Sequence, residues 1–210
     1  MMKTLTDLFP SLSLVPVVVI DDADDAVPLA NALLEGGITS IEITLRTAAG
    51  IKAIEQVATN VPDIAVGSGT ILSPEQMQQA HDAGAQFQVS PGITSALAAY
   101  AQKANINWLP GTANASDIML AHEHGFSHVK FFPASLSGGV PMIKQFASVF
   151  GGIKICPTGG ISLDNMNDYA ALPNVFAIGG SWLTPKQEIA NKNWDIITNI
   201  AKDSVAALKA

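Results

Sequence analysis

Hydrophobic residues recur along the chain in short continuous runs, and each run is followed by a stretch in which apolar residues recur at helical spacing. Short apolar runs rich in β-branched residues are typical of strands that are covered on both faces, as in a parallel sheet. The runs predict strands at residues 14–20, 38–45, 64–67, 87–89, 106–109, 129–132, 153–156 and 175–178.

The stretches between these runs predict helices, and several of them carry start or stop signals. Ser73-Pro74 is a typical helix start, while Gly36-Gly37 and Gly125 are typical stops. The predicted helices cover residues 21–36, 48–60, 73–84, 94–103, 115–124, 140–150, 162–170 and 185–209. A short amphipathic helix containing Leu5 and Leu8 precedes the first strand.

Eight strand–helix units follow one another in the chain. Their strand-to-strand period of roughly 20–25 residues predicts an α/β fold, a single (β/α)8 or TIM barrel. A chain of 210 residues is near the short end for this fold, so the loops must be tight. No linker, charge run or low-complexity segment divides the sequence, so we expect one domain over residues 1–210.

The composition limits the classes of partner. Apolar residues make up 48% of the chain and charged residues 14%, which suits a well-buried domain. The net charge of -7 provides no basic surface for nucleic acid or an anionic membrane. Cys156 is the only cysteine, so no internal disulfide can form, and a reducing, cytoplasmic location is expected. We find no signal peptide and no apolar run of the roughly 18 residues that a membrane span needs.

A lysine lies inside one of the predicted strands. Alternation along the strand places Lys130 and Phe132 on one face and Val129 and Phe131 on the other. Burial beside aromatic rings disfavours the charged form of the amine, and a neutral amine forms Schiff bases with carbonyl compounds. The alternative is a lysine that extends from the strand end to water.

The second predicted strand carries a carboxylate and a guanidinium on the same face. Alternation places Glu42, Thr44 and Arg46 toward the barrel lumen, with Ile41 and Ile43 toward the helices. Arg46 is the only arginine in the chain, and arginine is well suited to bidentate binding of carboxylate or phosphate. The alternative is a structural ion pair between Glu42 and Arg46.

Glycine-rich turns follow several predicted strands, at the end of the barrel where active sites lie. Such turns let backbone N–H groups approach an anion closely, and the seventh and eighth loops form the usual phosphate site of these barrels. Those two loops read Thr158-Gly159-Gly160 and Gly179-Gly180-Ser181. The four histidines have no recognised metal spacing and the first strand precedes no dinucleotide motif, so neither metal nor cofactor is expected.

Six motifs, taken together and in order, resemble the 2-keto-3-deoxy-6-phosphogluconate (KDPG) and 4-hydroxy-2-oxoglutarate aldolases, a family of class I aldolases. The motifs are Glu42-Ile43-Thr44-Leu45-Arg46, Gly67-Ser68-Gly69-Thr70, Ser90-Pro91-Gly92, Val129-Lys130-Phe131-Phe132-Pro133-Ala134, Pro157-Thr158-Gly159-Gly160-Ile161 and Ile178-Gly179-Gly180-Ser181-Trp182-Leu183. The resemblance spans essentially the whole chain and implies a (β/α)8 barrel, a homotrimer, a phosphorylated 2-keto acid as substrate, and no metal. Ser68 stands where members of the family commonly have alanine.

The resemblance also implies a role for each matching residue. Lys130 would form the Schiff base and Glu42 would transfer protons. Arg46 and Thr70 would hold the pyruvate carboxylate. The other implied contacts are pocket walls at Pro91 and Phe132, a substrate hydroxyl at Thr158, and the phosphate at Gly159, Gly160, Gly180 and Ser181.

The implied reaction cleaves KDPG to pyruvate and glyceraldehyde 3-phosphate. The galactonate form of the substrate and 4-hydroxy-2-oxoglutarate stay open as alternatives, and Thr158 favours the gluconate form by resemblance. Two other functions also stay open. One is a phosphate-binding isomerase or epimerase that uses Glu42 as a base, and the other is a non-catalytic binder of phosphorylated sugars.

Overall fold

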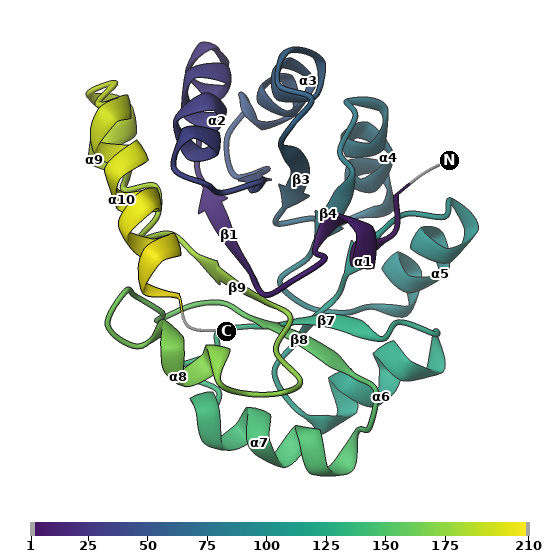
Figure 1. Cartoon of the computed structure of the whole chain (residues 1–210). Coiled ribbons are helices and arrows are strands. Elements are labelled where there is room, and N and C mark those ends of the chain that lie inside the picture. The colour runs from purple at the N-terminus through teal and green to yellow at the C-terminus, as the bar shows by residue number, and fades with distance from the viewer. Residues whose placement is uncertain (1–2, 209–210) are drawn as a thin grey trace.

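The computed structural model describes residues 3–208, in which a curved parallel sheet is surrounded by helices (Figure 1). The predicted α/β fold with a parallel sheet is therefore confirmed. The strands are β1 Ser13–Val18, β2 Ser40–Thr44, β3 Ala65–Gly69, β4 Phe87–Val89, β5 Trp108–Leu109, β6 Gly111–Thr112, β7 His128–Phe131, β8 Lys154–Pro157 and β9 Ala177–Gly180.

The strands form two hydrogen-bonded groups, and every strand pair is parallel. One group has the order β5-β4-β3-β2-β1-β9, and the other has the order β6-β7-β8. The predicted fifth strand, residues 106–109, is wrong in its bounds, because the chain pairs as β5 and again as β6 on either side of Pro110. Proline has no N–H for the ladder, but the Pro110 carbonyl still accepts a hydrogen bond from the Lys130 amide at 2.9 Å.

The helices are α1 Leu5–Leu8, η1 Ala23–Asp25, α2 Ala26–Glu35, α3 Gly50–Asn60, α4 Pro74–Asp82, α5 Ser95–Lys103, α6 Ala115–Glu123, α7 Gly139–Val149, α8 Met166–Ala170, α9 Lys186–Ala190 and α10 Trp194–Ala207. Polar side chains begin several of them, since Ser73, Thr94 and Asn114 each accept a hydrogen bond from the first turn. These caps match the predicted helix starts within a residue or two.

Two helix predictions are wrong in extent. The predicted helix at 185–209 is two helices, because the chain turns at residues 191–193 with Lys192 at a φ of 57°. Its predicted end at Lys209 lies outside the described residues. The predicted helix at 162–170 begins only at Met166, because Ser162 and Asn165 form a turn in which the Asn165 side chain accepts from the Ser162 amide.

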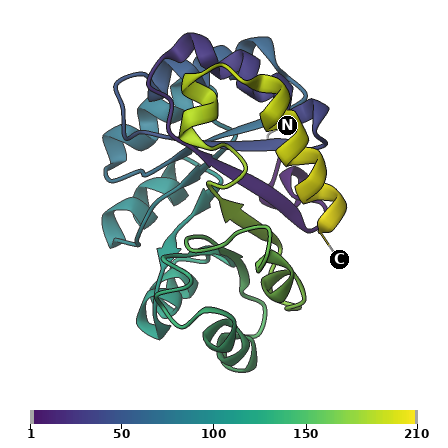
Figure 2. The ribbon, with the colours of Figure 1, turned by 90° about the vertical axis from the view of Figure 1, so that its left-hand side faces the viewer.

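The last elements of the chain pack beside the first strand–helix unit. Helix α10 lies next to α2 in both views of the ribbon, and Thr198 Oγ1 donates to the Ala32 carbonyl at 3.1 Å (Figures 1 and 2). Strand β9 pairs with β1 on the same side. Within residues 3–208, no helix is both long enough and apolar enough to cross a bilayer.

The interior of the sheet is apolar at the end where the strands begin. Helix α1 places Leu8 and Phe9 in this cluster, and the Phe9 ring meets Phe87 and Phe176 edge to face at 5.2 and 5.8 Å. Gly67 leaves room for the Phe87 ring, which would lie 2.4 Å from a Cβ at that position. The result is an apolar floor beneath the polar residues at the opposite end of the strands.

Candidate active site

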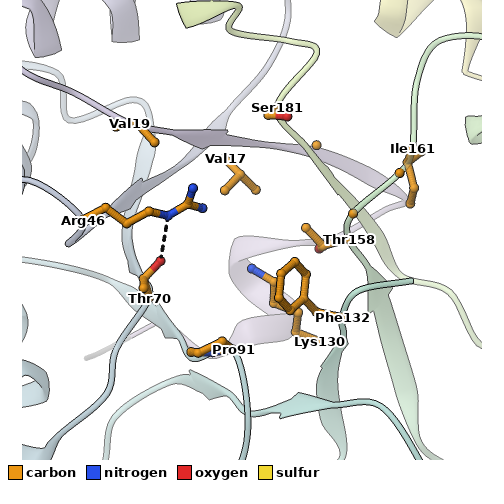
Figure 3. A pocket seen from close by; sticks show the side chains of 13 residues that line it. Val17, Val19, Arg46, Thr70, Pro91, Lys130, Phe132, Thr158, Ile161 and Ser181 are labelled. Carbon is orange, nitrogen blue, oxygen red and sulfur yellow. Dashed lines mark hydrogen bonds between the residues drawn. The ribbon is translucent and has the colours of Figure 1, made fainter. Parts of the chain in front are cut away.

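A cavity of about 410 Å³ opens where the strands end, and its size is in the usual range of ligand sites (Figure 3). It is lined by Val17, Val19, Arg46, Thr70, Pro91, Lys130, Phe132, Thr158, Gly159, Gly160, Ile161, Gly180 and Ser181. Every predicted site residue except Glu42 is therefore in the lining. The structure also places Val17, Val19 and Ile161 in the lining, which the sequence analysis did not predict. The alternation of Val17 and Val19, at and just beyond the end of β1, was a usable signal.

Lys130 and Glu42 form a buried ion pair beneath the cavity. The lysine Nζ lies 3.0 Å from Glu42 Oε1 and 3.3 Å from Oε2, and the two residues are only 6% and 3% exposed. The Nζ also lies 5.5 Å from the centre of the Phe132 ring, within reach of a cation–π contact. The alternative of a lysine extended to water is therefore wrong, and so is the Glu42–Arg46 ion pair, since the carboxylate pairs with Lys130.

The pocket for the Glu42 carboxylate exists because residue 69 is glycine. A Cβ at Gly69 would lie 2.3 Å from Glu42 Oε1 and 2.8 Å from its Cγ, closer than atoms can approach. Strands β2 and β3 are paired in register here, with Thr44 opposite Gly69. Because Gly69 has no side chain, it leaves the space that the Glu42 carboxylate occupies.

Cys156 is the neighbour of Lys130 in the sheet, because β7 and β8 pair these two residues in register. Burial is the main reason why the pKa of the Cys156 thiol is raised to about 12. The thiol is therefore neutral at physiological pH and does not compete with Lys130 as a nucleophile. Cys156 lies in the same buried apolar cluster as Phe87 and Leu109 and is a packing residue.

Arg46 and Thr70 lie together on the opposite side of the cavity from Phe132 (Figure 3). Arg46 Nε donates to Thr70 Oγ1 at 3.3 Å, and the rest of the guanidinium points toward the cavity. Thr70 has a φ of 61°, an uncommon conformation for a β-branched residue that costs roughly 1–3 kcal/mol. Strain of this kind clusters at binding sites, and here it brings the Thr70 hydroxyl to the arginine.

Gly159 and Gly160 form the turn after β8, with φ values of 98° and 74° that favour glycine. Thr158, just before the turn, has a buried hydroxyl without a hydrogen-bond partner of standard geometry in residues 3–208. A buried polar group in that condition is rare unless a ligand or water completes it. The Thr158 Oγ1 lies beside Gly179, where an added Cβ would come within 2.2 Å, and beside the Cys156 thiol.

The predicted last strand, 175–178, is wrong at its end, because β9 continues to Gly180. Gly180 therefore faces the cavity with its backbone only. A Cβ at Gly180 would lie 1.6 Å from the Trp182 ring, away from the cavity. Ser181 is the first residue beyond the strand, and its exposed side chain lines the cavity.

Within the described part of the chain, no three His, Cys, Asp or Glu side chains are grouped as metal ligands would be.

Comparison with known proteins gives a consistent assignment. The family model of KDPG and KHG aldolases matches residues 6–200. A 2-dehydro-3-deoxy-phosphogluconate aldolase of Pseudoalteromonas atlantica is 46% identical over 200 residues, which cover 95% of this chain and 93% of the relative. A KHG/KDPG aldolase of Escherichia coli is 43% identical over 195 residues, which cover 93% of this chain and 92% of the relative.

Two solved structures are closely similar to the whole chain. The KDPG aldolase of Legionella pneumophila, with pyruvate captured as a covalent carbinolamine intermediate, has a TM-score of 0.93 and 42% identity, covering 99% of each chain. The KDPG aldolase of Zymomonas mobilis with 3-phosphoglycerate has a TM-score of 0.91 and 39% identity, covering 100% of this chain and 99% of that one. With the buried lysine at the cavity and the match along nearly its full length, the chain belongs to the KDPG and KHG aldolase family.

Proposed function

We propose that the protein is a class I aldolase that cleaves KDPG to pyruvate and glyceraldehyde 3-phosphate through an imine on Lys130. One observation carries the proposal: the Lys130–Glu42 pair lies at 3.0 Å beneath the cavity. The similar Legionella structure, with pyruvate held as a covalent carbinolamine, supports the same chemistry. Lysine amines that attack carbonyl substrates are a recognised class of catalytic nucleophile.

The ion pair prepares the amine for attack. Glu42 takes the Lys130 ammonium proton along their hydrogen bond, which leaves a neutral amine with a free electron pair. The amine attacks the C2 ketone of the substrate and forms a carbinolamine. Glu42 returns its proton to the carbinolamine hydroxyl, which leaves as water and gives a cationic imine. This step restores the Glu42 carboxylate, and the imine withdraws electrons from C3 and C4 without a metal.

Bond cleavage follows from the same pair of residues. Glu42, acting through a water molecule, removes the C4 hydroxyl proton. The electrons of the C3–C4 bond move to the imine nitrogen, and glyceraldehyde 3-phosphate leaves. Glu42 then returns that proton to C3 of the remaining enamine, and water hydrolyses the resulting imine to release pyruvate and free Lys130.

The substrate's two anionic ends are bound at opposite sides of the cavity in this proposal. Arg46 and Thr70, which lie together, hold the carboxylate, and charge-assisted hydrogen bonds of this kind contribute about 1.5–3 kcal/mol each. The other proposed contacts are walls at Pro91 and Phe132, the Thr158 hydroxyl to a substrate hydroxyl, and phosphate contacts at Gly159, Gly160, Gly180 and Ser181.

Ser181 offers a direct test of the phosphate end, because its side chain lines the cavity and is exposed. A negative charge in Ser181→Asp should repel a phosphate dianion and reduce kcat/KM for KDPG by roughly 10- to 100-fold. The same variant should change kcat/KM for 4-hydroxy-2-oxoglutarate much less, since this substrate has no phosphate. Ser181→Asn is the matched control, because asparagine has nearly the same size as aspartate but carries no charge.

Equal losses on both substrates in Ser181→Asp would contradict the phosphate assignment. A substitution at Gly180 would not serve, because an added side chain meets the Trp182 ring at 1.6 Å. The effect of such a variant would come from disrupted packing rather than from the lost backbone contact.

We also propose a closed (β/α)8 barrel, a homotrimer and a cytoplasmic location. Closure is supported by parallel bridges between Ile155 and Val175 and between Thr158 and Gly179, which join the β8 side to the β9 side. The trimer follows from the family resemblance, and light scattering that gave the mass of a monomer or dimer would refute it. A free, buried Cys156 is consistent with a reducing compartment.

Wild-type turnover of three substrates tests the function and its alternatives. We expect kcat/KM to be highest for KDPG, with measurable cleavage of 4-hydroxy-2-oxoglutarate, in keeping with the KHG/KDPG name of the Escherichia coli relative. A preference for the galactonate form would move the assignment to that substrate. If the protein cleaved none of the three substrates and borohydride trapped no pyruvate adduct, the aldolase assignment would be wrong. The function would then be that of an isomerase, an epimerase or a simple binder.

A further inference from the structure

The hydroxyl of Ser90 is the meeting point of three hydrogen bonds at the edge of the cavity. Ser90 is fully buried, and its Oγ donates to the Gly92 carbonyl at 2.6 Å. The same oxygen accepts from Trp108 Nε1 at 3.1 Å and, over a longer 3.4 Å, from the Gly111 amide. One side chain on the turn after β4 therefore ties that turn to β5 and β6.

The turn that Ser90 closes carries Pro91, a lining residue beside Thr70 and Lys130 (Figure 3). Pro91 and Gly92 are both exposed, so burial in the core does not hold them in place. The Ser90 hydroxyl is thus a principal anchor of this wall of the cavity.

The same turn packs against the strand that supports the lysine. A Cβ at Gly111 would lie 2.3 Å from the Pro91 carbonyl carbon and 2.5 Å from the Gly92 nitrogen, so only glycine permits this contact. Gly111 is paired in register with Lys130 between β6 and β7. A shift of the Pro91–Gly92 peptide would therefore press on the segment next to the reactive amine.

We propose that Ser90 is a positioning residue for the aldolase reaction, acting through the Pro91–Gly92 turn to set the wall beside the Lys130 imine. The inference rests on the proposed function for the identity of the bound molecule. Pro91 lies near Lys130 and Thr70, the residues proposed to bind the pyruvyl part of the substrate. The cavity wall that Pro91 forms should therefore contact this part, which all candidate substrates share. Loss of the Ser90 hydroxyl should then slow every substrate alike, unlike a change at Ser181.

The test compares Ser90→Ala with Ser40→Ala. Ser40 is a matched control because it is also buried and its hydroxyl also donates to a backbone carbonyl, that of Leu14 at 3.2 Å. It lies in β2, and neither it nor Leu14 belongs to the cavity lining. Ser90→Ala should lower kcat/KM for KDPG and 4-hydroxy-2-oxoglutarate, and the rate of pyruvate trapping by borohydride, by about 10-fold each. Ser40→Ala should stay within about 2-fold of the wild type.

Two further variants separate positioning from folding. Ser90→Ala leaves the indole N–H of Trp108 buried without a partner, so the comparison is repeated in a Trp108→Phe background, where that N–H is absent.

A double-mutant cycle with Pro91→Ala then asks whether Ser90 acts through the wall that Pro91 forms, since effects that share one route do not multiply. When Pro91 is already alanine, we expect Ser90→Ala to lower kcat/KM by a further factor of less than about 2.

Hydrogen exchange of the backbone amides of residues 90 and 92, on either side of Pro91, gives a readout that does not depend on activity. Ser90→Ala should accelerate exchange in this turn, whereas Ser40→Ala should leave it unchanged. Unchanged exchange, equal kinetics in the two serine variants, or effects of Ser90 and Pro91 that multiply would each overturn the inference. Failure of the wild type to form an imine would instead refute the proposed function, and the exchange result would still decide the role of Ser90.

Discussion

A Lys130→Met variant is expected to lose about 10⁵-fold or more in kcat with KDPG, as enzymes do when a covalent nucleophile is removed. The Lys130 amine lies at the floor of the cavity, and the residue is 6% exposed with Glu42 at 3.0 Å. Among residues 3–208, no other lysine lines the cavity. Methionine keeps an unbranched side chain of similar length but cannot form an imine. Borohydride reduction in the presence of pyruvate should add the pyruvyl mass to the peptide that contains Lys130 of the wild type, and to no peptide of the variant.

The control for this variant must separate chemistry from folding. Lys130→Met leaves the Glu42 carboxylate buried without its partner, which costs roughly 3–5 kcal/mol of stability. The double variant Lys130→Met, Glu42→Gln removes that charge and should melt closer to the wild type. If the double variant folds but another lysine becomes labelled, the assignment of the imine to Lys130 is wrong.

The second large effect is expected at Glu42. A Glu42→Gln variant should still form the pyruvate imine, but more slowly, because the Lys130 proton must then pass to water. It should lose at least about 100-fold in kcat, the usual scale for general acid–base catalysis. The glutamine fits the space beside Gly69, and its amide oxygen can accept from Lys130 as Oε1 does at 3.0 Å. It cannot, however, take the proton of the C4 hydroxyl or return one to the enamine.

Glu42→Asp provides the matched comparison, because it keeps the carboxylate but shortens the side chain by one methylene. Partial activity in Glu42→Asp with little in Glu42→Gln would match a proton-transfer role. Steady-state kcat and the amount of trapped imine are measured on the same samples. Turnover of Glu42→Gln near that of the wild type would mean that Glu42 only pairs with Lys130.

Much of the cavity could be predicted because parallel strands end at one edge of a sheet. Residues such as Arg46, Pro91 and Thr158 follow different strands in the sequence, and each lines the same cavity. The periodicity of apolar runs was enough to place the strands, since each is buried on both faces. The exact strand ends were not predictable, and Gly180 proved to be inside β9, because pairing with Pro16 extends that strand.

The sequence by itself determined the parallel α/β fold, the order of the elements and the set of residues near the strand ends, because local periodicity and strand direction suffice for these. Only the tertiary structure decided that Glu42 pairs with Lys130, 88 residues away, and not with Arg46, four residues away. The reason is that such a pair depends on the registers of several strands and on space left by a small residue, here Gly69. The same holds for Ser90, whose hydroxyl reaches β5 and β6 only after the sheet has formed.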